Sequence, residues 1–322
     1  MNKISDYSAQ IEKVIRDLEF PGGNLSGLYE PISYSMTAGG KRLRPSLLMM
    51  TADAFGDAAS KAEKAAVGIE MFHNFTLLHD DVMDKSDMRR GRQTVHTKWD
   101  ENTAILSGDT MLTIATQCIA DVDDSVLRPV LDTFNDMALR VYEGQRLDMD
   151  FENSPNVELA DYIRMITDKT GALLGAAARI GAIIGGASAD DASRMAEYGV
   201  MLGIAFQIQD DWLDVFGDSS TFGKPIGGDI NNNKKSFLLL KGLSAGTSDS
   251  TALAEAMKLP AGPTKVKVVT RIYEKMDMSR ACREAVASYS KKALAALKAT
   301  SLSDERREPF RLLVDKLTGR RK

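Results

Sequence analysis

The sequence predicts an all-α protein folded as one large helical domain. Apolar residues recur every three or four positions along most of the 322-residue chain, which is the period of an amphipathic helix. No convincing pair of alternating strand segments occurs, although Val266–Tyr273 could be either helix or strand. The loop-like segments Gly246–Ser250 and Leu259–Pro263 are too short to separate domains. We therefore expect about ten helices in a single domain.

The helices are expected in order along the chain. Ile11, Val14 and Leu18 define the first helix, which ends at Pro21-Gly22-Gly23. Similar runs predict helices over residues 45–55, 62–79, 103–120, 125–150, 158–185, 190–217, 233–243, 265–277 and 279–299. An apolar run leads into the pattern Asp-Asp-x-x-Asp twice, at positions 80 and 210. This echo predicts equivalent helices, facing each other, in the two halves of the chain.

Charge and cysteine content exclude several classes of protein. The 41 basic and 45 acidic residues give a formal net charge of −4, so no global field attracts nucleic acid and any anion must meet local basic clusters. Cys118 and Cys282 match no disulfide framework or zinc spacing, which favours a cytoplasmic location. The N-terminal segment lacks the apolar core of a signal peptide. The longest apolar stretches, at 172–187 and 199–206, fall short of a membrane span, so we expect no stable membrane insertion.

Two aspartate-rich motifs carry the strongest chemical signal. They are Asp80-Asp81-Val82-Met83-Asp84 and Asp210-Asp211-Trp212-Leu213-Asp214. In a helix, the first and last aspartates of each motif project from one face. Like charges at this spacing are destabilising by roughly 0.2–0.5 kcal/mol per pair, and the C-terminal end of a helix disfavours negative charge further. One copy is more often a solvated helix end, but two copies indicate a bound cation, and carboxylate oxygens favour Mg²⁺ or Mn²⁺.

Basic residues near both motifs supply the other half of a binding site. Arg89, Arg90 and Arg92 follow the first motif, Lys224 follows the second, and the segment GGKRLRP at 39–45 lies upstream. A diphosphate that is bridged to carboxylates by Mg²⁺ and clamped by Arg and Lys would use all of these groups. The histidines at 73, 79 and 96 have no catalytic-triad or metalloprotease context, and each alone is more often a packed or surface residue.

The chain resembles the trans-isoprenyl diphosphate synthases of the polyprenyl synthetase family. The resemblance spans about Gly39 to Lys235 and rests on seven ordered motifs. They are GGKRLRP, HNFTLLHDDVMDKSDMRRG, GD at 108–109, GQRLD at 144–148, KTGAL at 169–173, FQIQDDWLD at 206–214 and GKPIGGDINNNKKSF at 223–237. It implies an isoprenoid-synthase helical bundle around a central cavity, and a homodimer.

The resemblance also implies roles for individual residues. The diphosphate of isopentenyl diphosphate is expected to bind Lys41, Arg44, His73 and Arg90. Three Mg²⁺ ions, which Mn²⁺ can replace, are expected on the allylic diphosphate, held by Asp80, Asp84 and Asp210 and supported by Asp81 and Asp214. Asp211, of the same motif as Asp210, is expected among the catalytic residues. The same diphosphate is expected to contact Arg89, Lys169, Lys224 and Lys234, and the developing allylic cation to lie beside Thr170 and Gln207.

The implied reaction joins two isoprenoid diphosphates head to tail. Cationic groups stabilise the departing pyrophosphate, so the allylic C–O bond ionises. The double bond of isopentenyl diphosphate then attacks the carbocation, and proton loss regenerates an allylic product. The allylic substrate could be dimethylallyl, geranyl or farnesyl diphosphate.

Two departures from the family pattern concern loops. Gln93 stands where the family usually has Pro, and Ser236-Phe237-Leu238 replaces a common Thr-x-Pro ending. Neither removes a charged ligand, so only the local loop geometry is in question.

Two other functions remain open. A class I terpene cyclase also ionises an allylic diphosphate, but it has no need for the second-substrate residues Lys41, Arg44 and Arg90. A catalytically silent subunit of a heteromeric synthase would have no reason to retain two repulsive carboxylate clusters. Both alternatives are therefore less favoured than the synthase.

Phe75 bears on the length of the product. It lies five residues before Asp80, or about 7.5 Å along a helix axis. A core aromatic is the plainer interpretation, but in the family this position lines the tunnel that receives the growing chain. With Thr76 small beside it, the resemblance favours geranylgeranyl diphosphate as product, with farnesyl diphosphate as the alternative.

Overall fold

The computed structural model describes residues 4–217 and 226–319. Regular structure in these residues is predominantly α-helical, which confirms the predicted all-α fold class. None of the described helices combines the length and the apolar character that crossing a membrane requires. The chain divides into two compact units, and the prediction of a single domain stays a prediction. The first unit comprises residues 1–135, 176–193 and 301–309, and the second comprises 136–175, 194–300 and 310–322.

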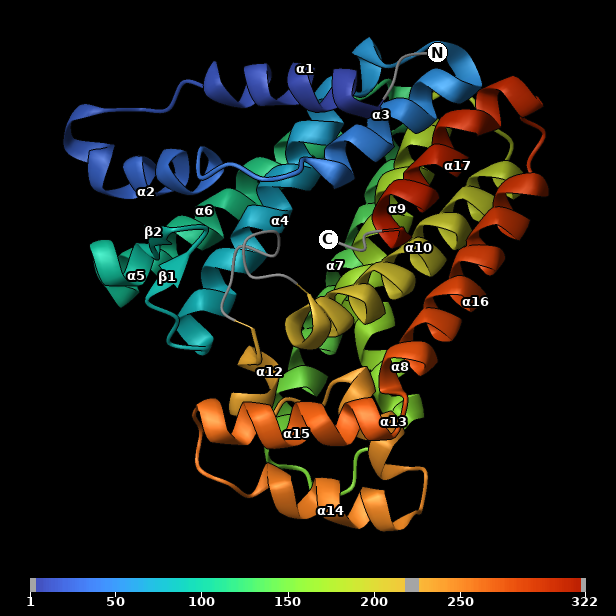
Figure 1. Cartoon of the computed structure of the whole chain (residues 1–322). Helices are drawn as coiled ribbons and strands as arrows, with labels where there is room; N and C mark the ends of the chain where they lie inside the picture. The colour runs from blue at the N-terminus through green and yellow to red at the C-terminus, as the bar shows by residue number, and fades with distance from the viewer. Residues whose placement is uncertain (1–3, 218–225, 320–322) are drawn as a thin grey trace. The chain divides into compact units, whose positions relative to one another are not determined.

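The first unit holds the N-terminal helices and a small hairpin (Figure 1). Its elements are α1 (Ile4–Arg16), α2 (Ser26–Met36), α3 (Leu43–Gly56), α4 (Glu63–Met83), β1 (Met88–Arg89), β2 (Arg92–Gln93), α5 (Val95–Lys98) and α6 (Glu101–Ala120), with 3₁₀ turns at Gly23–Leu25 and Ser60–Ala62. Four helices contribute residues to both units: α7 (Asp124–Asn153), α9 (Ala172–Ile184), α10 (Ala189–Phe216) and α17 (Asp304–Thr318).

The remaining elements belong to the second unit. They are α8 (Leu159–Ile166), a π-helical turn at Thr167–Gly171, α12 (Gly228–Asn231), α13 (Phe237–Leu243), α14 (Ser248–Met257), α15 (Pro263–Lys275) and α16 (Met278–Lys298). The core of this unit includes Tyr162, Ile208, Phe237 and Tyr273, which come from four different helices. Burial of these side chains fixes α8, α10, α13 and α15 together.

Close helix packing in the first unit positions the first aspartate motif. Helices α4 and α6 run side by side (Figure 1). A Cβ atom at Gly68 of α4 would lie only 2.9 Å from the carbonyl oxygen of Ala115 in α6. The missing side chain therefore permits the two backbones to approach, and α4 carries the motif at its C-terminal end.

Several helix predictions were right in type but wrong in extent. The run 158–185 is interrupted by the π-helical turn. In the run 233–243, residues 233–236 are not helical and α13 begins at Phe237. Gly246–Ser250 is not wholly a loop, because Thr247 caps α14 and the helix begins at Ser248. The ambiguous segment Val266–Tyr273 is helical, within α15.

Several features were not predicted, among them the short helices α5 and α12. Helix α2 contains Pro31, and a proline in the sequence usually indicates the boundary of a helix. Helix α14 begins within the segment expected as a loop and continues to Met257, beyond it. Helix α17 is highly charged, although Phe310, Leu313 and Leu317 keep a helical spacing on its buried face. The hairpin has only two residues in each strand, too few for the alternation that identifies a strand.

Candidate active site

The first aspartate motif lies at the C-terminal end of α4, as predicted. The backbone N–H of Asp84 caps the helix by donating to the carbonyl oxygen of Asp80 (2.8 Å). Asp80 is half-buried and Asp84 is exposed. Both carboxylates therefore lie where the helix dipole is unfavourable for negative charge, and a cation at this position would stabilise them.

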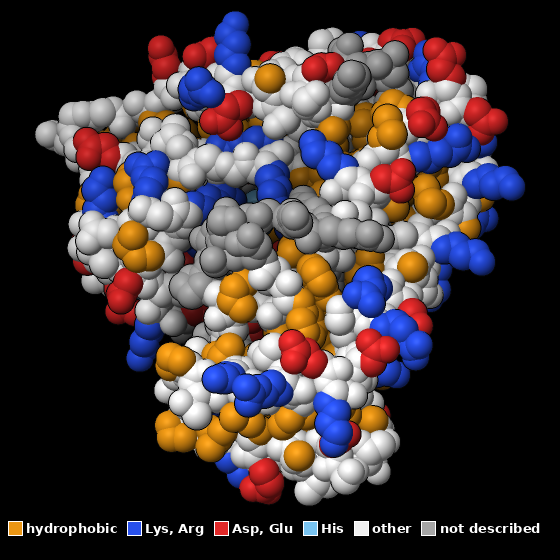
Figure 2. Space-filling view, in the orientation of Figure 1, with side chains coloured by type: hydrophobic (Ala, Val, Ile, Leu, Met, Phe, Trp, Pro, Cys, Tyr) orange, Lys and Arg blue, Asp and Glu red, His pale blue; other side chains and the backbone are white. Residues whose placement is uncertain are grey.

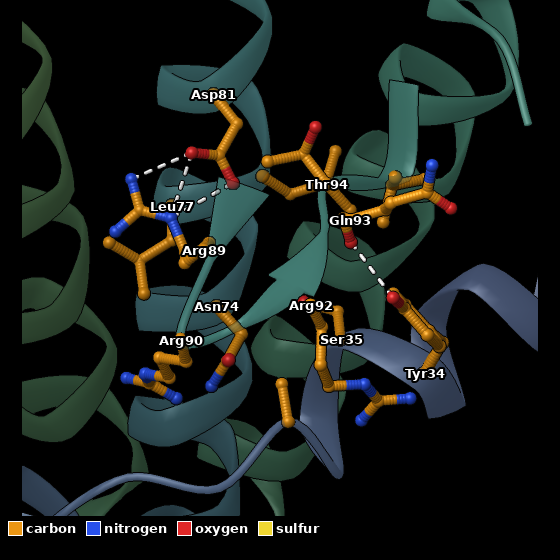
Figure 3. Close-up of a pocket in the computed structure, with 13 residues that line it drawn as sticks. Tyr34, Ser35, Asn74, Leu77, Asp81, Arg89, Arg90, Arg92, Gln93 and Thr94 are labelled. Atoms are coloured by element: carbon orange, nitrogen blue, oxygen red, sulfur yellow. Dashed lines mark hydrogen bonds and ion pairs between the residues drawn. The ribbon is translucent and has the colours of Figure 1, made fainter. Parts of the chain in front are cut away.

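The second residue of this motif, Asp81, is buried and paired with Arg89 (Figure 3). The Nε atom of Arg89 donates to both carboxylate oxygens, at 2.8 and 2.9 Å. Burial raises the pKa of Asp81, and Arg89 opposes that shift. An Nη atom of Arg89 is also 3.7 Å from Asp80 Oδ2. Arg89, expected to contact the allylic diphosphate, thus lies against the carboxylates of the first motif.

The hairpin that follows presents Arg90. Arg90 and Gly91 connect β1 to β2, and both have positive φ angles, 52° and 74°, as in a type I′ turn. The Nη1 atom of Arg90 donates to the carbonyl oxygen of Gly39. A Cβ atom at Gly40 would lie 2.9 Å from that same Nη1 atom, and Gly40 itself has φ of 142°. Gly40 therefore makes room for the Arg90 guanidinium, and Gly39 supplies the carbonyl oxygen that it contacts.

Arg44 and His73, both predicted to bind isopentenyl diphosphate, are in contact. Arg44 Nη1 lies 3.1 Å from His73 Nε2. Burial lowers the pKa of His73 well below its usual value, and the charges of Arg44, Arg90, Arg89 and Arg42 lower it further. His73 is therefore neutral, with Nε2 accepting the hydrogen bond from Arg44. The four arginines whose charges lower the pKa of His73 mark a cationic region.

Arg42 has a different role from its neighbours in the GGKRLRP segment. It is 2% exposed and forms ion pairs with Glu12 and Glu70, each at 2.7 Å. It also donates to the carbonyl oxygen of Met36 (2.6 Å). Lys41, by contrast, is exposed at the start of α3. Sequence analysis did not separate Arg42 from its neighbours, although Glu70 within an apolar helix was a signal that a buried partner was needed.

Phe75 is buried on α4 within an aromatic cluster. Its ring centroid is 5.6 Å from that of Phe72 and 4.8 Å from that of His79. A Cβ atom at Gly108 would lie 2.2 Å from His79 Nε2. The glycine of the GD motif therefore provides the space that His79 occupies beside Phe75. A role of Phe75 in product length stays a prediction.

The second motif lies in the last turns of α10, where Asp211 is buried among neutral donors. Its Oδ2 atom accepts hydrogen bonds from the Tyr162 hydroxyl (2.7 Å) and from the backbone N–H of Phe237 (2.8 Å). Burial, followed by the charge of Asp229, raises the pKa of Asp211 to about 7. The departure at 236–238 is compatible with this arrangement, because Ser236 caps α13 and Phe237 donates to Asp211 through its backbone N–H.

Asp214, at the end of the motif, is enclosed by the segment that leads into α12. The backbone N–H of Asp229 donates to Asp214 Oδ2 (3.0 Å). The backbone N–H of Gly227 donates to the carbonyl oxygen of Asp214 (2.7 Å). Burial and the negative charge of Asp229 raise the pKa of Asp214 to about 6. The charge of Asp229 therefore acts on both buried aspartates of the second motif, Asp211 and Asp214.

The π-helical turn supplies the remaining residues predicted near the allylic cation. Thr170 Oγ1 donates to Gln207 Oε1 (3.2 Å). Lys169 Nζ lies 2.6 Å from Asp148 Oδ2, and Asp148 was not assigned a role from sequence although it ends the GQRLD motif. A Cβ atom at Gly144 would lie 2.3 Å from the backbone nitrogen of Lys169. The glycine of that motif therefore lets α7 approach the turn.

Two predicted lysines remain. Lys234 is exposed, and its backbone N–H donates to the carbonyl oxygen of Asp229 (2.9 Å). This hydrogen bond holds the backbone of Lys234 beside that of Asp229. Lys224 lies outside the described residues. Within residues 4–217 and 226–319, no group of three or more Asp, Glu, His or Cys side chains is placed to hold a metal ion.

The described residues thus place arginines around a neutral histidine in one unit, and the buried carboxylates of the second motif in the other. A family model for polyprenyl synthetases matches residues 26–276. The chain belongs to the polyprenyl synthetase family, and it is a trans-isoprenyl diphosphate synthase, a prenyltransferase.

Individual relatives and structures agree with this assignment. The chain is 39% identical over 248 residues to a geranylgeranyl diphosphate synthase of Methanosarcina mazei, covering 76% of each chain. It is 40% identical over 253 residues to one of Saccharolobus solfataricus, again covering 76% of each chain. The fold is similar to a crystal structure of a geranylgeranyl pyrophosphate synthase, with a TM-score of 0.95, 39% identity and full coverage of both chains.

Proposed function

We propose that this enzyme condenses an allylic diphosphate with isopentenyl diphosphate to make geranylgeranyl diphosphate. The observation that carries the proposal is the separation of charge between the two motifs. The charges of Arg44, Arg89 and Arg90 act on the neutral His73 near the first motif, while burial and the charge of Asp229 raise the pKa values of Asp211 and Asp214 in the second. The first arrangement suits an anionic diphosphate, and the second suits a cation.

Mg²⁺ fits the second arrangement by its donor chemistry. Carboxylate oxygens are the ligands that Mg²⁺ prefers, and the raised pKa values of Asp211 and Asp214 show that carboxylate charge there is poorly compensated. Asp80, Asp84 and Asp210 would hold the ions, with Asp81, Asp211 and Asp214 in support. When bound, Mg²⁺ with diphosphate stabilises the negative charge on the departing pyrophosphate.

The protein's own residues bind and orient both substrates in this proposal. Lys41, Arg44, His73 and Arg90 hold the diphosphate of isopentenyl diphosphate, with His73 as a neutral acceptor that orients Arg44. Lys169, held by Asp148, contacts the allylic diphosphate together with Arg89, Lys224 and Lys234. The Thr170–Gln207 pair directs oxygen atoms toward the allylic cation.

The reaction balances without any further reactant. The allylic C–O bond breaks and its electron pair leaves with the pyrophosphate. The π electrons of isopentenyl diphosphate form the new C–C bond, and the released pyrophosphate takes the proton.

The product length is supported by the relatives and by Phe75. Both curated relatives described above are geranylgeranyl diphosphate synthases. Phe75→Ala is expected to lengthen the product, because removing a ring creates volume that another isoprene unit can fill. Phe134→Ala, which removes a ring that meets Phe72 edge-on, is the control for a cavity in the same cluster and is expected to leave product length unchanged. Mass spectrometry that finds the same product for Phe75→Ala and wild type would remove Phe75 from this role.

Two further proposals concern assembly and location. A homodimer is supported by Ile105 and Leu106 of α6, which are 45% and 58% exposed, and by the family resemblance. Light scattering coupled to size-exclusion chromatography measures the mass directly.

A cytoplasmic location is supported by Cys118 and Cys282, both of which are free thiols.

The decisive experiment uses the purified protein alone with Mg²⁺, isopentenyl diphosphate and each of dimethylallyl, geranyl and farnesyl diphosphate. Chain elongation to a twenty-carbon diphosphate is the expected result. Cyclised hydrocarbon formed without isopentenyl diphosphate would indicate a terpene cyclase, and turnover only with an added partner subunit would indicate a silent subunit. Products ending at fifteen carbons would replace geranylgeranyl with farnesyl diphosphate.

A further inference from the structure

Tyr34 of α2 contacts both residues of β2, the outer strand of the hairpin. Its hydroxyl donates to the carbonyl oxygen of Gln93 (2.8 Å). The guanidinium carbon of Arg92 lies 3.9 Å from the centroid of the Tyr34 ring. Figure 3 shows the hydroxyl pointing to Gln93 while the Arg92 side chain lies alongside the ring. One side chain therefore holds β2 by a hydrogen bond and by a cation–π contact.

Residues that follow the hairpin hold the Tyr34 ring in place. The Trp99 ring meets it edge-on, with centroids 5.2 Å apart, and Lys98 Nζ lies 4.0 Å from its centroid. Lysine and arginine side chains gather over α2 and the hairpin in the space-filling view (Figure 2). Packing against Trp99 limits the rotation of the tyrosine, so its hydroxyl stays directed at β2.

The position of β2 determines the position of Arg90. Arg89 and Arg92 are paired across the hairpin, and only Arg90 and Gly91 connect them. Thr94 closes the base of the hairpin by donating to the carbonyl oxygen of Ser86 (2.7 Å). With both turn residues in the left-handed region, the turn has few alternative conformations, so a displacement of β2 moves the Arg90 guanidinium.

We propose that Tyr34 is a positioning residue for isopentenyl diphosphate binding, acting through β2 on Arg90. The inference rests on the proposed function, because it takes from it the role of Arg90 at that diphosphate. Gln93, which stands where the family usually has Pro, is compatible with this role. Tyr34 donates to the backbone carbonyl of residue 93 and not to its side chain.

Tyr34→Phe is the test variant, because it removes the hydroxyl and keeps the ring. Tyr29→Phe is the matched control on the same helix, where Tyr29 stacks on Phe20 with centroids 6.0 Å apart. Arg92→Gln is a second test variant that removes the cation over the ring. Thermal unfolding of each variant verifies that it is folded.

The first measurement is hydrogen–deuterium exchange of the peptide that covers the hairpin, and it does not depend on activity. Tyr34→Phe and Arg92→Gln are expected to speed exchange in residues 86–94 by about threefold or more, because the hairpin opens more often. Tyr29→Phe is expected to leave it unchanged. Unchanged exchange in Tyr34→Phe would overturn the proposal whatever the enzyme makes.

The second measurement is steady-state kinetics with both substrates varied. Tyr34→Phe is expected to raise the KM for isopentenyl diphosphate roughly three- to tenfold, the size expected for one net hydrogen bond, and to leave the KM for the allylic substrate within about twofold. In an Arg90→Ala background, Tyr34→Phe is expected to have no further effect. Equal effects on both substrates, or an effect that persists without Arg90, would overturn the positioning role. Wild-type protein that does not elongate with isopentenyl diphosphate would instead overturn the proposed function.

Discussion

The two aspartate motifs have the same pattern but opposite electrostatic surroundings. In the first, the buried Asp81 is paired with Arg89, and arginines lower the pKa of the nearby His73. In the second, the buried Asp211 is held by the neutral groups of Tyr162 and Phe237, and burial with a neighbouring carboxylate raises its pKa to about 7. Two motifs of the same residue pattern therefore differ in how the charge of their buried aspartate is compensated.

The largest expected effect is common to both motifs. Asp80→Ala and Asp210→Ala are each expected to lower kcat at least about a hundredfold, because part of a metal-stabilised transition state is lost. Asp132→Ala removes an exposed carboxylate of α7 and serves as the control. Near-normal turnover in either variant, measured by product release at saturating Mg²⁺, would contradict the metal assignment for that motif.

The cationic surroundings of the first motif predict a selective binding defect. Arg44→Ala is expected to raise the KM for isopentenyl diphosphate roughly ten- to a hundredfold, the size of a charged hydrogen bond, and to change the KM for the allylic substrate far less. Arg128→Ala, on the exposed Arg128–Asp132 pair, controls for the loss of one positive charge. If both KM values rise equally, the division into two diphosphate sites is wrong.

The contrast between Asp81 and Asp211 predicts that the same Asp→Asn substitution changes stability differently at the two positions. At about pH 8 with EDTA, Asp81→Asn is expected to lower the free energy of unfolding by roughly 1–2 kcal/mol, because Arg89 loses its partner. Asp211→Asn is expected to leave it unchanged or raise it, because a poorly compensated buried charge is removed. Urea unfolding of both variants measures the difference. A larger loss in Asp211→Asn than in Asp81→Asn would reverse the comparison.

The smallest effect concerns the pH dependence of stability near the first motif. The pKa of His73 is lowered in the folded protein, so its contribution is present above the unfolded pKa of about 6.5 and is lost as pH falls below it. The free energy of unfolding should then fall by up to about 1.4 kcal/mol per pH unit from this group alone. His73→Gln keeps an acceptor for Arg44 and should make that slope shallower between about pH 6.5 and 5. Identical slopes for variant and wild type would mean that His73 titrates normally.

The glycines of the recognised motifs show what the sequence could predict and what it could not. The motifs GGKRLRP, GD and GQRLD were recognised as patterns, but the reason for their glycines was not predicted. Gly40, Gly108 and Gly144 make room for Arg90, His79 and the backbone of Lys169. Each of these contacts joins segments far apart in the chain, which local periodicity cannot report.

The sequence by itself determined the all-α fold, the place of both aspartate motifs at helix ends and the family. These follow from residue type and short-range spacing, since helix periodicity and the i,i+4 relation are local properties of the chain. Only the tertiary structure decided that Arg42 is a buried partner of Glu70, that Asp148 holds Lys169 and that Asp81 and Asp211 differ in charge compensation. The free energy of a charge depends on its burial and on neighbours that folding brings together, so identical motifs acquire different properties.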